Sequence, residues 1–276
     1  MATPRVSIAD KRRTFRELHA SGCFVIPNPW DVGSARYLQS LGFKALATTS
    51  SGFAWSRGHA DNEVSLDTVL AHLAELVAVT DVPLNADFES AFAQDAAGVA
   101  TNVRRAVETG VAGLSIEDST GDKDAPLFDI DVAVERIGAA RDAIDRAGGD
   151  TLLVGRAEGF LVGRTNLDEA IARLKAYANA GADCLYAPGL RTREHIAAVV
   201  AAVAPKPVNV LVSSPIGLSV ADLAALGVRR ISVGGALARA AWGGFIRAAT
   251  EIAEHGTFEA LGSAAPHAAL QKIFAI

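Results

Sequence analysis

Short runs of apolar residues recur along the chain, and each is followed by a longer amphipathic segment. Most of the runs are continuously apolar, which is typical of parallel strands that are buried on both faces. The longer segments are of helical length. The pattern predicts eight strands at Cys23–Ile26, Lys44–Thr48, Pro83–Ala86, Gly113–Ile116, Leu152–Gly155, Asp183–Ala187, Pro207–Leu211 and Arg229–Val233, with helices that include Ser65–Val79, Ala96–Thr109, Asp131–Ala147, Leu167–Ala180 and Thr192–Val203.

Eight successive strand–helix units predict a single (β/α)8 TIM barrel of the α/β class and argue against an open doubly wound sheet. An open dinucleotide-binding sheet would carry a glycine-rich turn after its first strand, whereas that turn here reads Pro27-Asn28-Pro29-Trp30-Asp31. We expect one barrel domain over residues 1–276. Within it, residues 1–21 are expected to form a helix that caps the barrel floor, and residues 245–276 a helical tail beyond the closing helix.

Composition and charge narrow the function. The chain has 276 residues, close to the roughly 250 of one barrel, and a net charge of −5 without any basic run, which argues against nucleic-acid binding. No apolar stretch approaches the roughly 18 residues of a membrane span. The charged N-terminus does not resemble a signal peptide, and Cys23 and Cys184 form no disulfide framework, so we expect a cytoplasmic protein.

Acidic residues gather where the predicted strands end. Converging carboxylates repel one another and lose hydration, so a positive partner is required, and a hard cation such as Mg2+ takes oxygen ligands of this kind. Only one basic residue, Arg156, is placed at a strand end. The ordinary alternative is that the acids are helix N-caps and solvated loop charges. The acidic residues are Asp61, Asp87, Glu89, Glu117, Asp118 and Glu158.

Asp87, Glu89 and Glu117 are the acids that most strongly indicate a shared site. Alternate residues of an extended strand share a face, so Asp87-Phe88-Glu89 is expected to direct both carboxylates to one side. Glu117 ends the neighbouring predicted strand and lies within reach of both. These three acids are therefore expected to belong to one site.

Motifs at successive strand ends resemble the isocitrate lyase/phosphoenolpyruvate mutase superfamily. They run in order through nearly the whole barrel. The first four together are far more specific than any one, and the match continues through a fifth. The motifs are Asn28-Pro29-Trp30-Asp31-Val32-Gly33-Ser34-Ala35, Thr49-Ser50-Ser51-Gly52-Phe53, Asn85-Ala86-Asp87-Phe88-Glu89, Ser115-Ile116-Glu117-Asp118 and Gly155-Arg156-Ala157-Glu158.

The resemblance implies a set of roles. Asp87 would be the direct ligand of Mg2+, or of Mn2+ in its place, while Asp61, Glu89 and Glu117 would hold metal-bound waters. A loop of small residues would receive a substrate carboxylate or phosphonate on its backbone N–H groups, and Arg156 would neutralise the substrate's oxyanion. That loop comprises Ser50, Ser51 and Gly52.

The chain departs from the family after the fourth strand. Lyases of the superfamily carry a cysteine motif there, whereas Ser119–Pro126 contains neither Cys nor His. Lys123 is a candidate for a catalytic loop lysine, with a solvated loop charge as the alternative. Tyr186 is a candidate proton donor or a packing residue of the rim. Asn209 is a candidate substrate ligand or an inward-facing polar residue of the barrel.

These features favour a Mg2+-dependent lyase that cleaves a C–C bond in a small 2-oxo or 2-hydroxy di- or tricarboxylate through an enolpyruvate-type anion. Oxaloacetate decarboxylase-like or hydrolase-like chemistry suits the missing cysteine better than methylisocitrate cleavage does. The alternatives are phosphonopyruvate-type C–P mutase or hydrolase chemistry and a non-catalytic barrel that binds an oxyacid. We further expect a mobile lid at Ser119–Phe128. The resemblance implies a homodimer or homotetramer in which the tail is exchanged between subunits.

Overall fold

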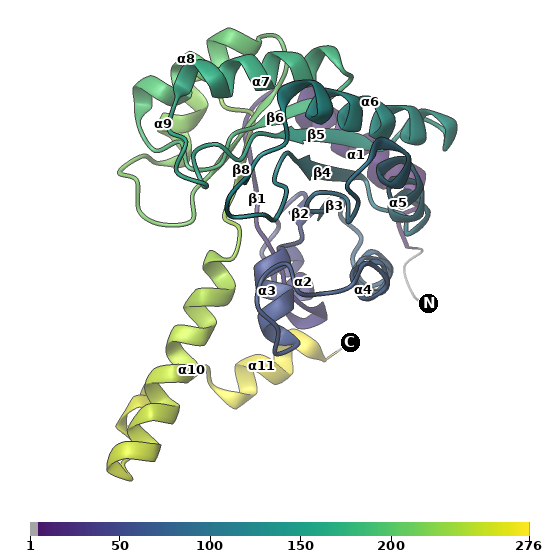
Figure 1. Cartoon of the computed structure of the whole chain (residues 1–276). Coiled ribbons are helices and arrows are strands. Elements are labelled where there is room, and N and C mark those ends of the chain that lie inside the picture. The colour runs from purple at the N-terminus through teal and green to yellow at the C-terminus, as the bar shows by residue number, and fades with distance from the viewer. Residues whose placement is uncertain (1–4, 276) are drawn as a thin grey trace.

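Eight parallel strands form the centre of the molecule. The computed structural model describes residues 5–275. All eight predicted strands are present, each within two residues of its expected bounds, and helices surround them (Figure 1). The strands are β1 (Phe24–Ile26), β2 (Leu46–Ala47), β3 (Leu84–Asp87), β4 (Gly113–Glu117), β5 (Leu152–Arg156), β6 (Cys184–Tyr186), β7 (Val208–Leu211) and β8 (Arg230–Ser232).

The sheet curls into a barrel. Its strand order is β1-β8-β7-β6-β5-β4-β3-β2, and every hydrogen-bonded pair in this order is parallel. At the remaining seam, the backbone N–H of Ala47 donates to the oxygen of Pro27 over 3.1 Å, which joins β2 to the chain just after β1. The predicted (β/α)8 barrel is therefore confirmed.

The helices begin where the sequence supplies a capping side chain. Asp31 and Ser34 form a reciprocal capping box at α2, and Ser65 and Thr192 cap two others by accepting a backbone N–H. The predicted helices are confirmed to within one residue. The outer helices are α2 (Val32–Ser40), α3 (Ser50–Ser56), α4 (Leu66–Val79), α5 (Ala96–Glu108), α6 (Ile130–Arg146), α7 (Leu167–Asn179), α8 (Arg193–Val203) and α9 (Val220–Ala225).

The N-terminal helix α1 (Ile8–Ala20) closes the barrel floor, as expected. Its Phe15 is fully buried among small and apolar residues at the amino ends of the strands. Residues 1–4 of the expected segment lie outside the described part of the chain. Phe15 packs against Ile26, Ala45, Ala47, Ala112 and Leu152.

The last long helix of the chain continues into the tail. Helix α10 (Ala236–His255) runs unbroken through the predicted boundary at 245 and points away from the barrel (Figure 1). After a short 3-10 turn (Glu259–Ser263), helix α11 (His267–Phe274) lies against α2, where the Phe274 ring approaches Gly33. Residue 276 lies outside the described range. The helix continues through residue 245, although Gly243 and Gly244 directly precede that position.

The projecting tail exposes an apolar face. Phe245 is 62% exposed and Phe258 63%, and the Trp242 and Phe245 rings pack edge to face. An exposed patch of large apolar side chains is unfavourable in water and is typical of a surface that meets another protein. As for membranes, none of the helices within residues 5–275 is both long and apolar enough to cross a bilayer.

The packing of Phe15 under the barrel yields a stability prediction. A Cβ at Gly113 would lie 2.6 Å from a ring carbon of Phe15 and 2.8 Å from the side-chain oxygen of Asn85. We expect Gly113→Ala to lower the free energy of unfolding by about 1–3 kcal/mol, since the tightly packed floor must shift. Urea denaturation measures this change.

Gly138→Ala is the matched control. Gly138 lies inside α6, and a Cβ there would meet no atom within 4 Å. The same substitution should raise stability there by about 0.5–1 kcal/mol, because alanine is the better helix former. Equal effects at the two positions would contradict the packing argument.

Candidate active site

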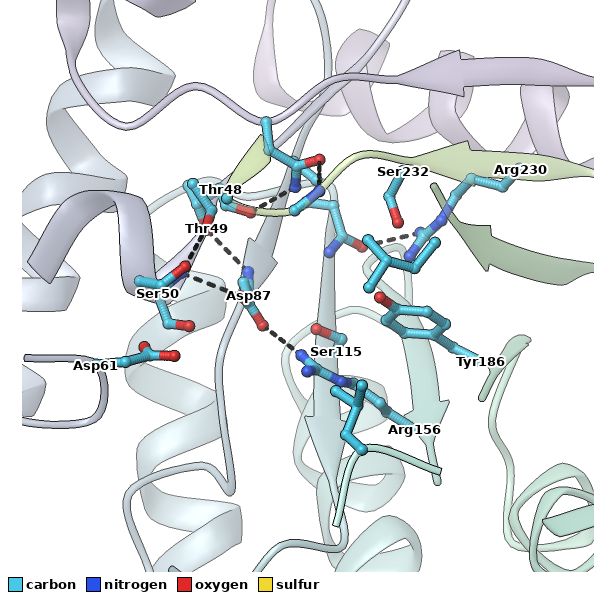
Figure 2. Close-up of a pocket in the computed structure, with 18 residues that line it drawn as sticks. Thr48, Thr49, Ser50, Asp61, Asp87, Ser115, Arg156, Tyr186, Arg230 and Ser232 are labelled. Atoms are coloured by element: carbon cyan, nitrogen blue, oxygen red, sulfur yellow. Dashed lines mark hydrogen bonds and ion pairs between the residues drawn. The ribbon is translucent and has the colours of Figure 1, made fainter. Parts of the chain in front are cut away.

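A cavity of about 190 Å³ opens at the carboxyl ends of the strands. This is the space that about six water molecules take in the liquid, so it suits a small ligand. Side chains from β3, β4, β5, β6 and β8 and from the segment after β2 point into it (Figure 2). Those labelled in the figure are Thr48, Thr49, Ser50, Asp61, Asp87, Ser115, Arg156, Tyr186, Arg230 and Ser232.

Arg156, the last residue of β5, holds three carboxylates together. Its Nη1 lies 2.9 Å from Asp87 and 3.1 Å from Glu117, and its Nε lies 2.5 Å from Glu158. Burial alone would lower the pKa of Arg156, but these three charges raise it well above its usual range. The guanidinium therefore stays charged and is the electrostatic centre of the site.

The acids outnumber this cation. Burial raises the pKa of Glu117 well above its usual range, against the opposing charge of Arg156. Burial, followed by the charges of Asp87 and Asp61, raises the pKa of Glu89 to about 8. Carboxylates that resist ionisation in this way would be stabilised by a further positive charge.

This donor set fits a hard divalent cation. Within residues 5–275, no three His, Cys, Asp or Glu side chains are grouped so that all could bind one ion directly. Mg2+ commonly takes one or two carboxylates directly and keeps several waters. The arrangement therefore fits one direct carboxylate ligand with the other acids at water-mediated distance.

The backbone conformation that brings Glu89 near Asp87 differs from the expected extended strand. Strand β3 ends at Asp87, and Glu89 has φ +47°, in the left-handed region that non-glycine residues rarely adopt. The idea that residues 87 and 89 share one face of an extended strand was therefore wrong. Their carboxylates interact because the chain turns after the buried Phe88, and strained backbone of this kind is common at functional sites.

Of the three substrate-binding residues predicted after β2, two line the cavity and one does not. Ser50 and Ser51 line the cavity, but the Ser50 N–H already donates to Asp87 over 3.0 Å. Gly52 does not line it, and its N–H donates to the Thr49 hydroxyl. A Cβ at Gly52 would lie 3.1 Å from Trp30, so this glycine serves close packing of α3.

Two other predicted residues lie on the cavity wall. Asp61 is at the exposed rim, where burial of its carboxylate on the cavity side raises its pKa, as does the charge of Asp87. Tyr186 is 7% exposed, and the Arg156 guanidinium lies 5.2 Å from its ring centre. Burial raises the pKa of Tyr186 to about 12, so its hydroxyl stays protonated and can donate.

Asn209 and Lys123 do not line the cavity. Asn209 is buried, where its Nδ2 donates to the Ser232 hydroxyl over 2.9 Å and its Oδ1 accepts from Arg230. Lys123 is exposed at the tip of a hairpin that begins after β4. A bridge between Ser119 and Leu127 holds the base of that hairpin.

Sequence reasoning missed part of the site. Glu158, noted among the acids but given no role, is a partner of Arg156. Asp118 is turned away from the cavity and accepts from Arg173 over 3.1 Å and from Tyr177 over 2.6 Å. It also accepts the N–H of Glu158, so it fixes the backbone beside Arg156. Arg230 escaped notice because it lies at the inner end of β8 and not at its carboxyl end.

Comparisons with known proteins agree with this geometry. The family model described as phosphoenolpyruvate phosphomutase matches residues 15–253. Oxaloacetate decarboxylase of Paraburkholderia xenovorans (strain LB400) is 31% identical over 68% of this chain and 64% of its own. A crystal structure from Burkholderia cenocepacia J2315 with the designation lyase/mutase superposes with a TM-score of 0.94, at 49% identity over 98% of both chains. The structure of 2,3-dimethylmalate lyase covers 98% of this chain and 95% of its own, with a TM-score of 0.83 and 27% identity.

The acid cluster predicts an unusual dependence of stability on pH. The pKa of Glu89 is about 8 in the folded protein, against 4.5 for a glutamate in the unfolded chain. Between these two pH values the folded protein therefore binds one more proton than the unfolded chain. Metal-free protein in EDTA should therefore lose stability as pH rises from about 4.5 to about 8. Thermal unfolding at a series of pH values measures this slope.

The substitution Glu89→Gln should flatten that slope, since glutamine has no proton to lose. Glu135→Gln, at an exposed position of α6, is the matched control and should leave it unchanged. A stability that rises with pH in wild-type protein would show that the acids are not crowded as described.

Proposed function

Because the chain belongs to the phosphoenolpyruvate phosphomutase family, we propose that it is a Mg2+-dependent lyase that cleaves a C–C bond in a small 2-oxo or 2-hydroxy di- or tricarboxylate. The bond would break next to a carbonyl, leaving an enolpyruvate-type anion. The observation that carries the proposal is the cluster of Asp87, Glu117 and Glu158 around Arg156 beside a small polar cavity. Members of this superfamily are lyases or mutases, and the relatives named above act on oxaloacetate and on 2,3-dimethylmalate.

The acids supply the metal site in this proposal. Asp87 would hold Mg2+ or Mn2+ directly, and Asp61, Glu89 and Glu117 would hold it through water. The raised pKa values of the last three agree with a cation as their missing partner. When bound, such a cation supplies Lewis-acid stabilisation of an enolate oxygen.

Residues of the chain itself would bind and orient the substrate. Arg156 lies beside the acids and would neutralise the developing oxyanion, because a buried guanidinium acts strongly where water is excluded. Ser50 and Ser51 also line the cavity and would position a substrate carboxylate. Tyr186, which stays protonated, would donate a hydrogen bond or a proton to the same anion.

Cysteine chemistry is not part of this mechanism. The hairpin after β4 carries no cysteine, and Cys184 lies buried in β6, where burial raises the pKa of its thiol. Cys23 is half-buried just before β1. Decarboxylation or hydrolysis of an oxaloacetate-like acid therefore suits the site better than methylisocitrate cleavage. The second candidate is C–P chemistry on a phosphonopyruvate-like acid, which the family description favours.

The decisive experiment is a turnover assay with Mg2+ and a panel of 2-oxo and 2-hydroxy acids, including oxaloacetate and phosphonopyruvate, that follows pyruvate release and each remaining substrate. Asp87→Ala should lower turnover and Mg2+ affinity, measured by calorimetry, by about a hundredfold or more. Asp129→Ala is the control, because Asp129 is exposed at the start of α6 and makes no capping hydrogen bond.

Turnover of a C–P substrate alone would favour the second candidate. Binding of 2-oxo acids without any turnover would leave the chain as a non-catalytic oxyacid-binding barrel. Equal Mg2+ affinity in wild type and Asp87→Ala would contradict the metal assignment.

We propose that the exposed hairpin Ser119–Phe128 closes over the cavity as a lid and brings Lys123 to the substrate. Lys123→Ala should then lower turnover by about a hundredfold while Mg2+ affinity is retained, as expected for the loss of a proton-transfer group. Lys175→Ala, on an exposed face of α7, is the matched control. Full activity of Lys123→Ala would remove this residue from the mechanism.

We also propose that the tail of one copy packs against a second copy, giving a homodimer or homotetramer. The exposed apolar face of α10 provides the surface. Light scattering at micromolar concentration should give a multiple of the monomer mass, and Phe245→Asp should shift it toward the monomer. Val132→Asp, at an exposed apolar position of α6, should not. A monomeric wild type would overturn this proposal.

A further inference from the structure

Arg230 is a second buried arginine on the wall of the cavity. It begins β8 and is only 2% exposed, yet it lines the cavity floor. Its Nε donates to the side-chain oxygen of Asn209 over 2.9 Å, and its Nη1 donates to that of Asn85 over 3.2 Å. Both acceptors are neutral amides, and both are themselves buried.

The charge of Arg230 has no counter-charge beside it. In the described part of the chain, no carboxylate forms a salt bridge with Arg230, whereas Arg156 has three. A guanidinium carries five N–H donors. The two amides take two of them, and no acceptor among residues 5–275 takes the other three. A buried cation in this state is unfavourable until an anion joins it.

The two arginines lie on one row of the barrel wall. Following the strand register, Arg156 pairs with Tyr186, Tyr186 with Asn209, and Asn209 with Arg230. Tyr186 and Ser232 extend into the space beside Arg230 (Figure 2). A small anion at the floor would therefore meet one free guanidinium edge and two hydroxyl groups.

A purely structural role explains less of this arrangement. Barrel interiors are filled well by branched apolar side chains, which bring no charge to compensate. Asn209 could hold Ser232 without Arg230, since it uses a different atom for each. The open N–H groups and the position on the cavity wall are explained by a ligand.

We propose that Arg230 binds a second carboxylate of the substrate at the cavity floor and thereby makes the enzyme selective for dianionic acids. The identity of the first group, a 2-oxo or 2-hydroxy acid held beside Asp87 and Arg156, rests on the proposed function. Arg230 is then the specificity-determining residue, because its open N–H groups line the cavity and would form charge-assisted hydrogen bonds with an anion at the far end of the substrate.

Two pairs of acids test this proposal in saturating Mg2+. Calorimetry gives the affinity for each acid that is not turned over, and the KM takes its place for an acid that is. The pair 2-oxoglutarate and 2-oxopentanoate, and the pair oxaloacetate and 2-oxobutanoate, each differ only in a terminal carboxylate that is replaced by methyl. The wild type should bind the diacid of at least one pair about tenfold or more tightly, as expected for charge-assisted hydrogen bonds. Arg230→Met and Arg230→Gln should remove that preference and leave the affinity for the monoacid unchanged.

Arg229→Met is the matched control, because Arg229 is the preceding residue and its side chain donates to the backbone oxygen of Gly22 outside the cavity. It should keep the preference. A folded Arg230 variant that still prefers the diacid, or a wild type with no preference in either pair, would overturn this assignment. The turnover assay described above tests the proposed function separately. An enzyme that turns over an acid of that panel but shows no preference in either pair would overturn the Arg230 assignment alone.

Discussion

The structure of the site depends on the attraction between Arg156 and the carboxylates around it. A largely buried guanidinium and three largely buried carboxylates would each be unfavourable alone, and they are tolerated because each carboxylate lies 2.5 to 3.1 Å from a nitrogen of Arg156. Asp87, Glu117 and Arg156 end adjacent strands, so the closure of the barrel is what brings them together. Asp118 accepts the backbone N–H of Glu158 and so fixes the chain beside Arg156. Arg173 and Tyr177 in turn hold Asp118 in place by donating to its carboxylate.

This cluster is not arranged for stability. The raised pKa of Glu89 and its left-handed backbone both indicate strain that apolar residues would avoid. Natural proteins keep such features where a ligand relieves them. The excess of negative charge at the rim suits a cation, and the unbalanced positive charge of Arg230 at the floor suits an anion. The cavity thus favours a cation at its rim and an anion at its floor. A small oxyacid that chelates a cation through one end and carries an anionic group at the other would suit both.

The barrel and the tail differ in how far they bury their apolar side chains. The barrel buries its own core, with Phe15 closing the floor. Helix α10 instead leaves the barrel and presents Trp242, Phe245 and Ile246 to solvent. No covering for these side chains comes from the described part of the same chain. The proposed second copy would cover that face, while the cavity is built within one barrel.

The sequence by itself determined the barrel, because parallel strands buried on both faces leave continuous apolar runs and helices start at capping residues such as Asp31 and Ser65. It also placed Asp87, Glu117 and Arg156, since the ends of barrel strands meet at one mouth. Only the tertiary structure decided how Glu89 turns, that Gly52 packs against Trp30, and that Asn209 supports Arg230. Those outcomes depend on backbone dihedrals and on contacts between residues more than twenty positions apart. A one-dimensional pattern of polar and apolar residues carries no information about either.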